Sequence, residues 1–544
     1  MREEPGVNGA LQSTGSMAVG TLASRATGFV RTVVIAGAIG RTVGDAYNVA
    51  NTVPNIVYEL LLGGVLTSVV VPLLVAGAHK ESDGGERHAQ SLLTVVVALL
   101  GAASVVAVLI APQIIHVYMA SSPVSGDRAH LATIFARFFL PQIFFYGVGA
   151  MLGAILNVRG SFSPPMWAPV LNNLVVIATG LLFIGVTSVG HVDAGVLTTG
   201  QTLLLAIGTT LGVVLQTVAL IPALKAVGFR LRLRWDLRGV GLRAATRLAG
   251  WVFVYVLANQ VGYLLITRLA TGIDQPGAYS VYSYAFILFL LPHSVVAVSV
   301  MTALLPQMST NAVEGRLGDV ASDLAMGIKL AAVVMIPAAF AAIVLGPLIS
   351  VVIFAHRTLP ASTGRLIGMT LAAYAVSLLP FSAFQSQLRA FYALRDTRTP
   401  ALVNIVLAAI NVGAGWLLLL LLPTHLQVVG LAVAFSLSYF VGFAWFTILL
   451  RRRLGTPPGE HVVRTVLRLS VAAALAAAVA YAVAHAALRA RPEGFGGSLL
   501  ALIAGVAVGT PLYIAFIRRM RIPEVHSIAE LVRGTMAGRM TRSR

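Results

Sequence analysis

The amino-acid sequence predicts an all-α polytopic membrane protein with about fourteen transmembrane helices, arranged as two six-helix lobes followed by two C-terminal helices. Hydrophobic residues make up 58% of the 544-residue chain, only 10% of residues are charged, and the mean hydropathy is +0.88. Charged residues make up about a quarter of a typical soluble domain. Apolar stretches recur along the whole chain, and the two halves share a weak repeat. These observations exclude a soluble globular protein.

The predicted helices are apolar stretches of about 20 residues or more, the length that spans a hydrocarbon core. The first stretch contains Arg25 and Arg31 and lacks a small-residue cleavage site. It should therefore remain as a span and not be removed as a signal peptide. The stretches lie at 17–40, 45–79, 91–119, 131–157, 165–188, 201–226, 244–270, 278–308, 322–355, 366–394, 399–422, 427–450, 464–488 and 497–517.

A weak internal repeat relates the two halves of the chain. Its matching residues keep the same order, with offsets of 232 to 239 residues, as in transporters built from duplicated halves. Because each copy holds an even number of helices, both copies should have the same orientation, with a central cavity between them. The matches are Ala46-Tyr47-Asn48-Val49 with Ala278-Tyr279-Ser280-Val281, Pro72 with Pro306, Leu140-Pro141 with Leu379-Pro380, Arg159 with Arg395, and Pro164 with Pro400.

The repeat also predicts the domain boundaries. Outside it, the Ala-rich face from Ala472 to Ala480 should pack on a lobe or line a lipid groove. We expect a cytoplasmic N-terminal tail at 1–16, an N-lobe at 17–226, a basic cytoplasmic linker at 227–243, a C-lobe at 244–453, helices 13 and 14 within 454–519, and a basic cytoplasmic tail at 520–544.

Charge predicts the orientation of the chain. The formal net charge is +19, and membrane proteins keep Lys and Arg in short cytoplasmic loops. With the N-terminus inside, the most basic segments, Lys225 to Arg247, Arg451 to Arg468 and Arg518 to Arg544, all lie on the inner side. We expect a multi-pass protein of the bacterial cell membrane with both termini in the cytoplasm and no nucleic-acid partner. The absence of cysteine excludes disulfides and thiolate metal sites, and no metal site is predicted.

Two arginines in the first span are the sharpest candidates for a functional role. Arg25 and Arg31 lie at different depths of the same helix, and an unpaired guanidinium facing lipid costs several kcal/mol, at roughly +2.5 to 3.5 on insertion scales. At least one of them should face a polar cavity. The alternative is a structural ion pair with Asp45 or Glu59, or an interfacial anchor for Arg25.

The second span carries a polar stripe. Steps of three and four residues place Asn48, Asn51, Asn55 and either Tyr58 or Glu59 on one helix face. Pro54 should kink the helix, because proline removes a backbone donor. A bent polar helix beside an arginine helix suits a gated cavity, although interhelical hydrogen bonding would also explain the stripe. Weaker polar candidates in other spans are Asn172, Asn173, Asn259, Gln260, Arg389, Asn404 and Asn411.

Two motifs carry a resemblance to a known family. Ser24-Arg25-Ala26-Thr27-Gly28-Phe29-Val30-Arg31, followed by Asp45-Ala46-Tyr47, Pro54-Asn55 and Pro72, resembles the opening of the MurJ (MviN) lipid II flippases. The segment from Leu388 to Pro400 resembles a later motif of the same family. The family belongs to the multidrug, oligosaccharidyl-lipid and polysaccharide exporter superfamily, which has two six-helix lobes.

The resemblance implies transport of an undecaprenyl-pyrophosphate-linked peptidoglycan precursor from the inner to the outer leaflet by alternating access. It implies no catalytic residue and no cofactor, with membrane potential or a monovalent cation biasing the return. The expected partners are this substrate, membrane lipids and envelope-synthesis proteins. Expected substrate-binding residues are Arg25, Arg31, Asn51, Asn55, Tyr58 and Glu59, and expected gating or structural polar residues are Asp45, Arg389 and Asp396.

The sequence also departs from the family pattern. Tyr58 and Glu59 stand where the family commonly has two arginines, and Ile287 lies nearest the place of a further arginine in helix 8. Asn411 stands at the place of an asparagine that binds a cation in some relatives, but Gly415 stands in place of the accompanying aspartate, so no cation site is carried over. These departures predict a less cationic cavity.

Three other functions remain open. One is a flippase or exporter of another polyprenyl-linked glycan or a drug, which the short loops do not distinguish. A membrane transferase is a second possibility, but it would need a catalytic carboxylate or histidine near an outer loop, and Asp127, Asp193, Asp274 and Glu493 are scattered singly. The third is an envelope scaffold that transports nothing.

Overall fold

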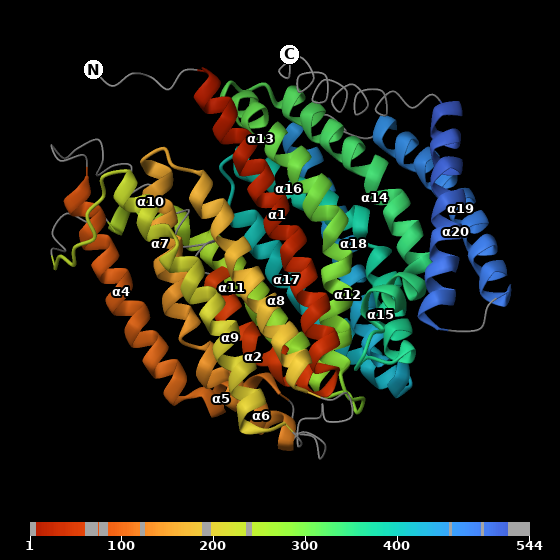
Figure 1. The fold of residues 1–544 in the computed structure, drawn as a ribbon. Helices are drawn as coiled ribbons and strands as arrows, with labels where there is room; N and C mark the ends of the chain where they lie inside the picture. Colours follow the sequence, from red (N-terminus) through yellow and green to blue (C-terminus); the bar gives the residue numbers. More distant parts are fainter. Residues whose placement is uncertain are drawn as a thin grey trace, which may run out of the picture. The chain divides into compact units, whose positions relative to one another are not determined.

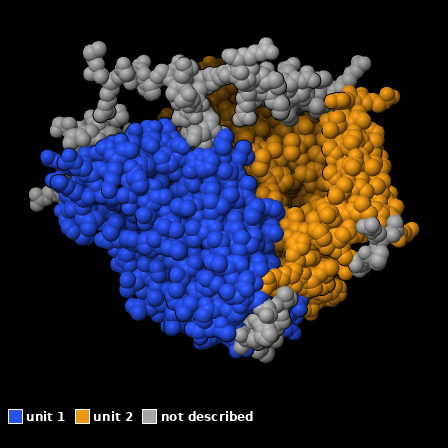
Figure 2. All heavy atoms as spheres, in the orientation of Figure 1, with its two compact units in different colours: residues 1–280 blue, residues 281–544 orange. Residues whose placement is uncertain are grey.

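The structure is a computed structural model that describes residues 7–59, 74, 85–119, 126–187, 197–235, 242–455, 460–490 and 494–520. Every element within these ranges is a helix (Figure 1). This confirms the all-α polytopic class. The described chain forms two compact units, residues 1–280 and 281–544 (Figure 2), and each is described by itself. The lobe boundaries expected from the repeat stay a prediction.

Unit 1 contains the helices that carry the arginine and asparagine motifs. Helix α1 packs along α8, α2 packs on α6, and α8 packs on α9. The first turn of α12 also belongs to unit 1. Its helices are α1 (Val7–Ile39), α2 (Thr42–Glu59), α4 (Glu86–Leu109), α5 (Ala111–Tyr118), α6 (Gly126–Phe139), α7 (Gln142–Val158), α8 (Ser163–Val186), α9 (Thr199–Val218), α10 (Leu220–Ala226) and α11 (Leu242–Thr271).

Unit 2 begins within α12, which continues through a π-helical turn, His293–Ala297, into α13. The long helix α14 packs against α15, α16, α19 and α20. Its elements are α12 (Ala278–Pro292), α13 (Val298–Val313), α14 (Leu317–Phe354), α15 (Ala361–Ala375), α16 (Leu378–Ala393), α17 (Arg398–Leu421), α18 (Thr424–Leu454), α19 (Glu460–Ala490) and α20 (Phe495–Arg519).

The number of membrane spans is close to the prediction. Within the described residues, 12 helices are long and apolar enough to cross a membrane, and joining α15 with α16, which meet at a 49° bend, gives up to 13. The predicted span at 45–79 is described as a helix only as far as Glu59. The count of fourteen therefore stays a prediction, since most of this span lies outside the described residues.

Small residues set the closest helix contact of unit 2. Where α14 meets α15, a Cβ added at Gly368 would lie 2.3 Å from the Cα of Pro347, and one at Gly346 would lie 2.8 Å from the Gly368 carbonyl oxygen. Any side chain at Gly368 would force the two helices apart. Membrane helices gain their association energy from such close packing, because lipid tails already solvate apolar side chains.

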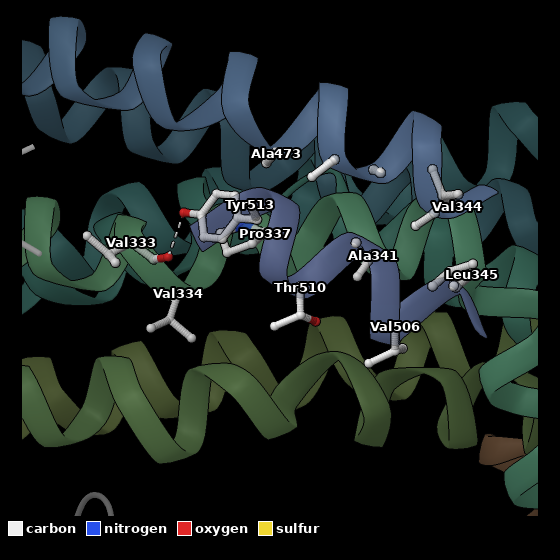
Figure 3. Close-up of a pocket in the computed structure, with 15 residues that line it drawn as sticks. Val333, Val334, Pro337, Ala341, Val344, Leu345, Ala473, Val506, Thr510 and Tyr513 are labelled. Carbon is white, nitrogen blue, oxygen red and sulfur yellow. Dashed lines mark hydrogen bonds between the residues drawn. The ribbon is translucent and has the colours of Figure 1, made fainter. Parts of the chain in front are cut away.

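The last two helices pack on α14 and enclose an apolar groove. Ala472, Ala473 and Ala476 are buried against α14, and a groove of about 300 Å³ lies between α14, α19 and α20 (Figure 3). At one end, the Tyr513 hydroxyl donates to the Val333 carbonyl at 3.0 Å. Pro337 lacks the N–H that would normally serve this carbonyl, so Tyr513 supplies the missing donor. The Ala-rich face thus both packs on unit 2 and lines a groove.

Candidate functional site

The candidate site in unit 1 is built around Arg31. This residue is half-buried in α1, and its charge acts on the phenols of Tyr47 in α2 and Tyr146 in α7. Tyr146 in turn packs against Tyr58, with ring centroids 4.6 Å apart. Tyr146 therefore packs on Tyr58 and also lies within the electrostatic range of Arg31, two residues predicted to bind substrate. The guanidinium of Arg31 can bind a phosphate through its own N–H donors.

The polar stripe of α2 has the geometry that its spacing predicts. Asn48, Asn51 and Asn55 are all half-buried, whereas Val49 and Val53, between them, are buried. The Asn55 amide donates to the Asn51 carbonyl at 2.8 Å, beside Pro54. The stripe therefore contains both local hydrogen bonds and a partly accessible surface. The Glu59 side chain lies outside the described residues.

Buried hydroxyls form a directed chain beside this stripe. The Thr52 hydroxyl donates its proton to the Asn48 carbonyl at 2.8 Å, so the Tyr279 hydroxyl, 2.7 Å away, must donate to Thr52. The Tyr263 hydroxyl, 2.9 Å from that of Tyr279, then donates to Tyr279. The same reasoning makes Tyr47 the donor to Thr209, whose own proton goes to the Leu205 carbonyl. Each hydroxyl has a fixed role because it carries a single proton.

Asp45 caps the first turn of α12. Its carboxylate accepts hydrogen bonds from the Gly277 N–H at 3.0 Å, the Ser280 N–H at 2.8 Å and the Ser280 hydroxyl at 2.8 Å. Helix N-termini leave such N–H groups without partners and attract negative charge. Arg128 lies 3.7 Å from the same carboxylate, and both side chains are buried. Asp45 therefore pairs with Arg128 within the described residues, not with Arg25 or Arg31.

The turn before α12 is shaped to reach this carboxylate. Gly277 has φ +84°, and a Cβ there would lie 2.4 Å from the Cβ of Arg41. Glycine is required both by the backbone conformation and by the close approach. The Asn48 amide adds a hydrogen bond of 3.2 Å to the Ser280 hydroxyl. Asn48 and Ser280 hold equivalent positions in the predicted repeat, so the two copies of this motif touch each other.

Arg25 has a different environment from Arg31. Its side chain is exposed on α1, two turns nearer the N-terminus. Next to it, Asn173 in α8 donates to the Ser24 carbonyl and to the Thr27 hydroxyl, both at 3.0 Å. Asn172 donates to Gln216 at 3.1 Å. These two asparagines thus join helices of unit 1, the structural role that the sequence left open for them.

The remaining predicted site residues, Arg389 and Asp396, belong to unit 2. Arg389 is half-buried on α16, on the face that also carries Gln385 and Tyr392. Asp396 lies in the turn before α17, where its carboxylate accepts from the Thr399 N–H at 3.0 Å and pairs with Arg453 at 2.5 Å. Asp396 therefore ties the turn to the end of α18.

Sequence reasoning missed Tyr146, Tyr279 and Arg128. Tyr279 was visible as the counterpart of Tyr47 in the repeat, but nothing in the local pattern indicates that its hydroxyl joins two helices. Within the described residues there is no cluster of three or more His, Asp or Glu side chains able to hold a metal. The arrangement offers binding and positioning of an anion.

Comparison with known proteins agrees with this chemistry. A family model described as lipid II flippase MurJ matches residues 35–504. A relative from Haemophilus influenzae, named probable lipid II flippase MurJ, is 27% identical over 77% of this chain and 82% of its own. A relative from Burkholderia cenocepacia, named lipid II flippase MurJ, is 27% identical over 71% and 73%.

Solved structures share the fold. A structure titled lipid II flippase MurJ, inward closed conformation, has a TM-score of 0.74 at 20% identity and covers 93% of this chain and 99% of its own. An inward-facing multidrug transporter of the MATE family has a TM-score of 0.64 at 16% identity, covering 80% and 99%. The fold is therefore the one that the family resemblance implied.

Proposed function

Because the chain belongs to the lipid II flippase MurJ family, we propose that it moves lipid II from the inner to the outer leaflet for cell-wall synthesis. It does so by alternating access in the bacterial cell membrane, with both termini in the cytoplasm. The observation that carries this proposal is that Arg31 is half-buried in α1, a helix of unit 1, near the half-buried polar stripe of Asn48, Asn51 and Asn55 on α2 in sequence order. A diphosphate needs such donors, since its charge is prohibitive in hydrocarbon.

Binding is divided between the head and the tail of the substrate. The diphosphate is held by Arg31, while Tyr58, Asn51 and Asn55 contact the attached sugars. Arg25, exposed on the same helix and nearer the cytoplasm, meets the anion first and passes it to Arg31. The polyprenyl chain stays in the bilayer, so no covalent chemistry is required and the protein acts as a transporter without a catalytic residue.

Asp45 acts as an outer latch in this proposal. With the N-terminus inside, the α1–α2 and α11–α12 turns both lie on the outer side of the membrane. Asp45 then holds α12 by its first turn, and α12 continues into unit 2. Release of these hydrogen bonds frees α12 when the site opens outward, and membrane potential biases the return because the site carries fixed charge.

The test is depletion of the protein in its host, with labelled lipid II followed to the outer leaflet. Wild type, Arg31→Ala, Arg25→Ala and, as a matched control, Arg451→Ala at the exposed end of α18 are expressed at equal levels. We expect wild type and Arg451→Ala to restore export, Arg31→Ala to fail, and Arg25→Ala to restore it only in part. Full export with Arg31→Ala would remove Arg31 from the site.

A second cargo is favoured by one observation. Tyr58 and Glu59 stand where the resemblance leads us to expect arginines, so the site is less cationic than the family pattern. Another polyprenyl-linked glycan is then the candidate. Undiminished lipid II export on depletion, together with accumulation of a different polyprenyl-linked glycan inside the cell, would replace lipid II as the cargo.

A further inference from the structure

The segment after α10 is an exposed ribbon of alternating charge and apolar surface. Residues Phe229 to Trp235 form no helix or turn. Arg230, Arg232 and Arg234 are exposed, and so are Leu231, Leu233 and Trp235, at 41%, 68% and 73%. The backbone N–H groups of Arg230 and Arg234 bond to Glu86 and Thr94, which lie eight residues, or about 12 Å, apart along α4, and four residues cover such a span in nearly extended backbone, where alternate residues point to opposite sides. One edge of the ribbon is therefore cationic and the other is apolar.

The ribbon is fixed along α4 by hydrogen bonds at successive turns of that helix. Glu86 accepts from the Arg230 N–H at 3.2 Å, Gln90 donates to the Arg230 carbonyl at 2.8 Å, and Thr94 accepts from the Arg234 N–H at 2.7 Å. Phe229 is 2% exposed and anchors the start, under the guanidinium of Arg159 at 5.1 Å. The ribbon is thus a positioned element.

This position is the edge of the hydrocarbon core. The first five residues of α4, Glu86 to Gln90, are polar or small, and the continuous apolar run begins with Leu92 and Leu93. Arg230 bonds to Glu86 and Gln90 in the polar turn, and Arg234 bonds to Thr94, one to two turns deeper, about 6–12 Å along the helix. Tryptophan is enriched at this depth of a bilayer, and arginine reaches from it to the phosphates.

The carboxylate nearest to the ribbon is already engaged. Glu86 accepts from the backbone of Arg230 and lies 4.0 Å from Arg159. Within the described chain, no ion pair is formed by the side chains of Arg230, Arg232 or Arg234. Three exposed guanidiniums beside inserted apolar side chains complement a layer of lipid phosphates.

We propose that residues 230–235 bind anionic phospholipid headgroups at the membrane surface, with Leu231, Leu233 and Trp235 inserted among the acyl chains. The proposal rests on the proposed orientation only in assigning this surface to the inner leaflet. The occupant is the bulk anionic lipid, since the ribbon lies along α4, whose side chains Leu99 and Leu109 are exposed at 66% and 73% and face lipid in a membrane.

The test compares lipid retention by the purified full chain in native mass spectrometry. Phosphatidylglycerol and phosphatidylcholine of matched acyl chains are titrated against wild type, a ribbon variant (Arg230→Gln, Arg232→Gln and Arg234→Gln) and a control variant (Arg451→Gln, Arg452→Gln and Arg518→Gln). All six arginines are exposed, so both variants lose the same charge. We expect the ribbon variant to weaken the tightest phosphatidylglycerol site by roughly tenfold or more, and the control to leave it unchanged.

A second measurement tests insertion of the apolar edge. The emission of Trp235 is the fluorescence of wild type minus that of Trp235→Phe. Brominated phosphatidylglycerol in nanodiscs should quench this emission, and it should quench the Trp235 emission of the ribbon variant less. The proposal would be overturned if wild type retained phosphatidylcholine as well as phosphatidylglycerol, or if the ribbon and control variants lost equal affinity for phosphatidylglycerol. It would also be overturned if inorganic phosphate or lipid II displaced the bound phosphatidylglycerol, or if Trp235 were not quenched. Lipid II flipping by the ribbon variant in phosphatidylcholine liposomes should equal that of wild type. Failure of wild type itself to flip would count against the proposed function alone.

Discussion

Around α2 in unit 1, buried polar groups join the helices, whereas around Phe435 in unit 2 aromatic rings join them. Around α2, the Asp45 carboxylate, the Tyr279–Thr52 pair and the Tyr47–Thr209 pair connect helices by hydrogen bonds. In unit 2, rings from four helices pack around Phe435 in edge-to-face or tilted geometry. They are Phe286, Phe289, Tyr374, Phe381 and Tyr439.

The difference indicates that these two regions respond differently to a conformational change. Hydrogen bonds in a membrane are modest, at about 0.6 kcal/mol on average, and they can exchange partners during a conformational change. Interlocked rings lose contact area when they move, because packed cores shift between discrete arrangements and do not deform continuously. Unit 1 therefore suits a switching anion site, and the ring cluster of unit 2 suits a rigid body.

Asp45→Ala should have the largest effect. It removes the carboxylate beside the buried Arg128 and the acceptor of the Gly277 and Ser280 N–H groups at the start of α12, so we expect the free energy of unfolding to fall by about 3–5 kcal/mol. The measurement is the melting temperature in detergent. Asp45→Asn keeps the shape of the side chain and one acceptor oxygen, so its melting temperature should lie between those of Asp45→Ala and wild type. An unchanged melting temperature for Asp45→Ala would show that unit 1 does not depend on its polar contacts.

Phe435→Ala tests the aromatic side of the comparison. It opens a cavity between five rings of unit 2, and we expect a loss of about 2–3 kcal/mol, near the low end for such truncations because lipid already solvates apolar groups. Phe435→Leu, which refills most of the space, should lose less than half of this. The melting temperatures of the two variants are compared with that of wild type. Equal melting temperatures for Phe435→Leu and Phe435→Ala would mean that the volume filled at this position does not determine the stability of unit 2.

Tyr279→Phe removes only a hydroxyl from unit 1. That hydroxyl donates to Thr52 and accepts from Tyr263, so we expect a loss of about 1 kcal/mol. Tyr439 packs its ring on Phe381 and Phe384 in unit 2, and Tyr439→Phe preserves these contacts. The free energy of unfolding of this control variant should lie within about 0.5 kcal/mol of the wild-type value. A larger loss of unfolding free energy from Tyr439→Phe than from Tyr279→Phe would contradict the contrast between the two regions.

Asp396 should show the smallest effect and a characteristic pH dependence. Burial raises the pKa of this carboxyl, but hydrogen bonds from Thr399 and the charge of Arg453 outweigh it, so the pKa lies below its ordinary value of 3.8. A lowered pKa in the folded state gives stability that is present above pH 3.8 and is lost as the pH falls through the folded-state pKa.

For the half-exposed Arg453 pair we expect less than about 1 kcal/mol. Melting curves of wild type and Asp396→Asn should therefore run parallel from pH 7 to pH 5 and converge only in more acidic buffer. Convergence that begins near neutral pH would contradict a lowered pKa.

Much of the fold followed from the sequence. Hydropathy identified the spans, because a bilayer accepts only long apolar helices, and the resemblance at Ser24 to Arg31 indicated the family that the comparison then confirmed. The three- and four-residue spacing of Asn48, Asn51 and Asn55 predicted one shared face, which α2 has. The role of these residues in substrate binding stays a prediction.

What only the tertiary structure decided is which polar groups meet. From the sequence, an ion pair of Asp45 with Arg25 or Arg31 was one alternative. In the structure, Asp45 instead pairs with Arg128 and accepts a hydrogen bond from the first turn of α12. The fold also packs Tyr146 against Tyr58 and lays Arg230 to Trp235 along α4. Periodicity fixes the face of a helix on which a residue lies, because helical geometry is local. The partner on that face depends on how distant helices pack, which no local pattern encodes.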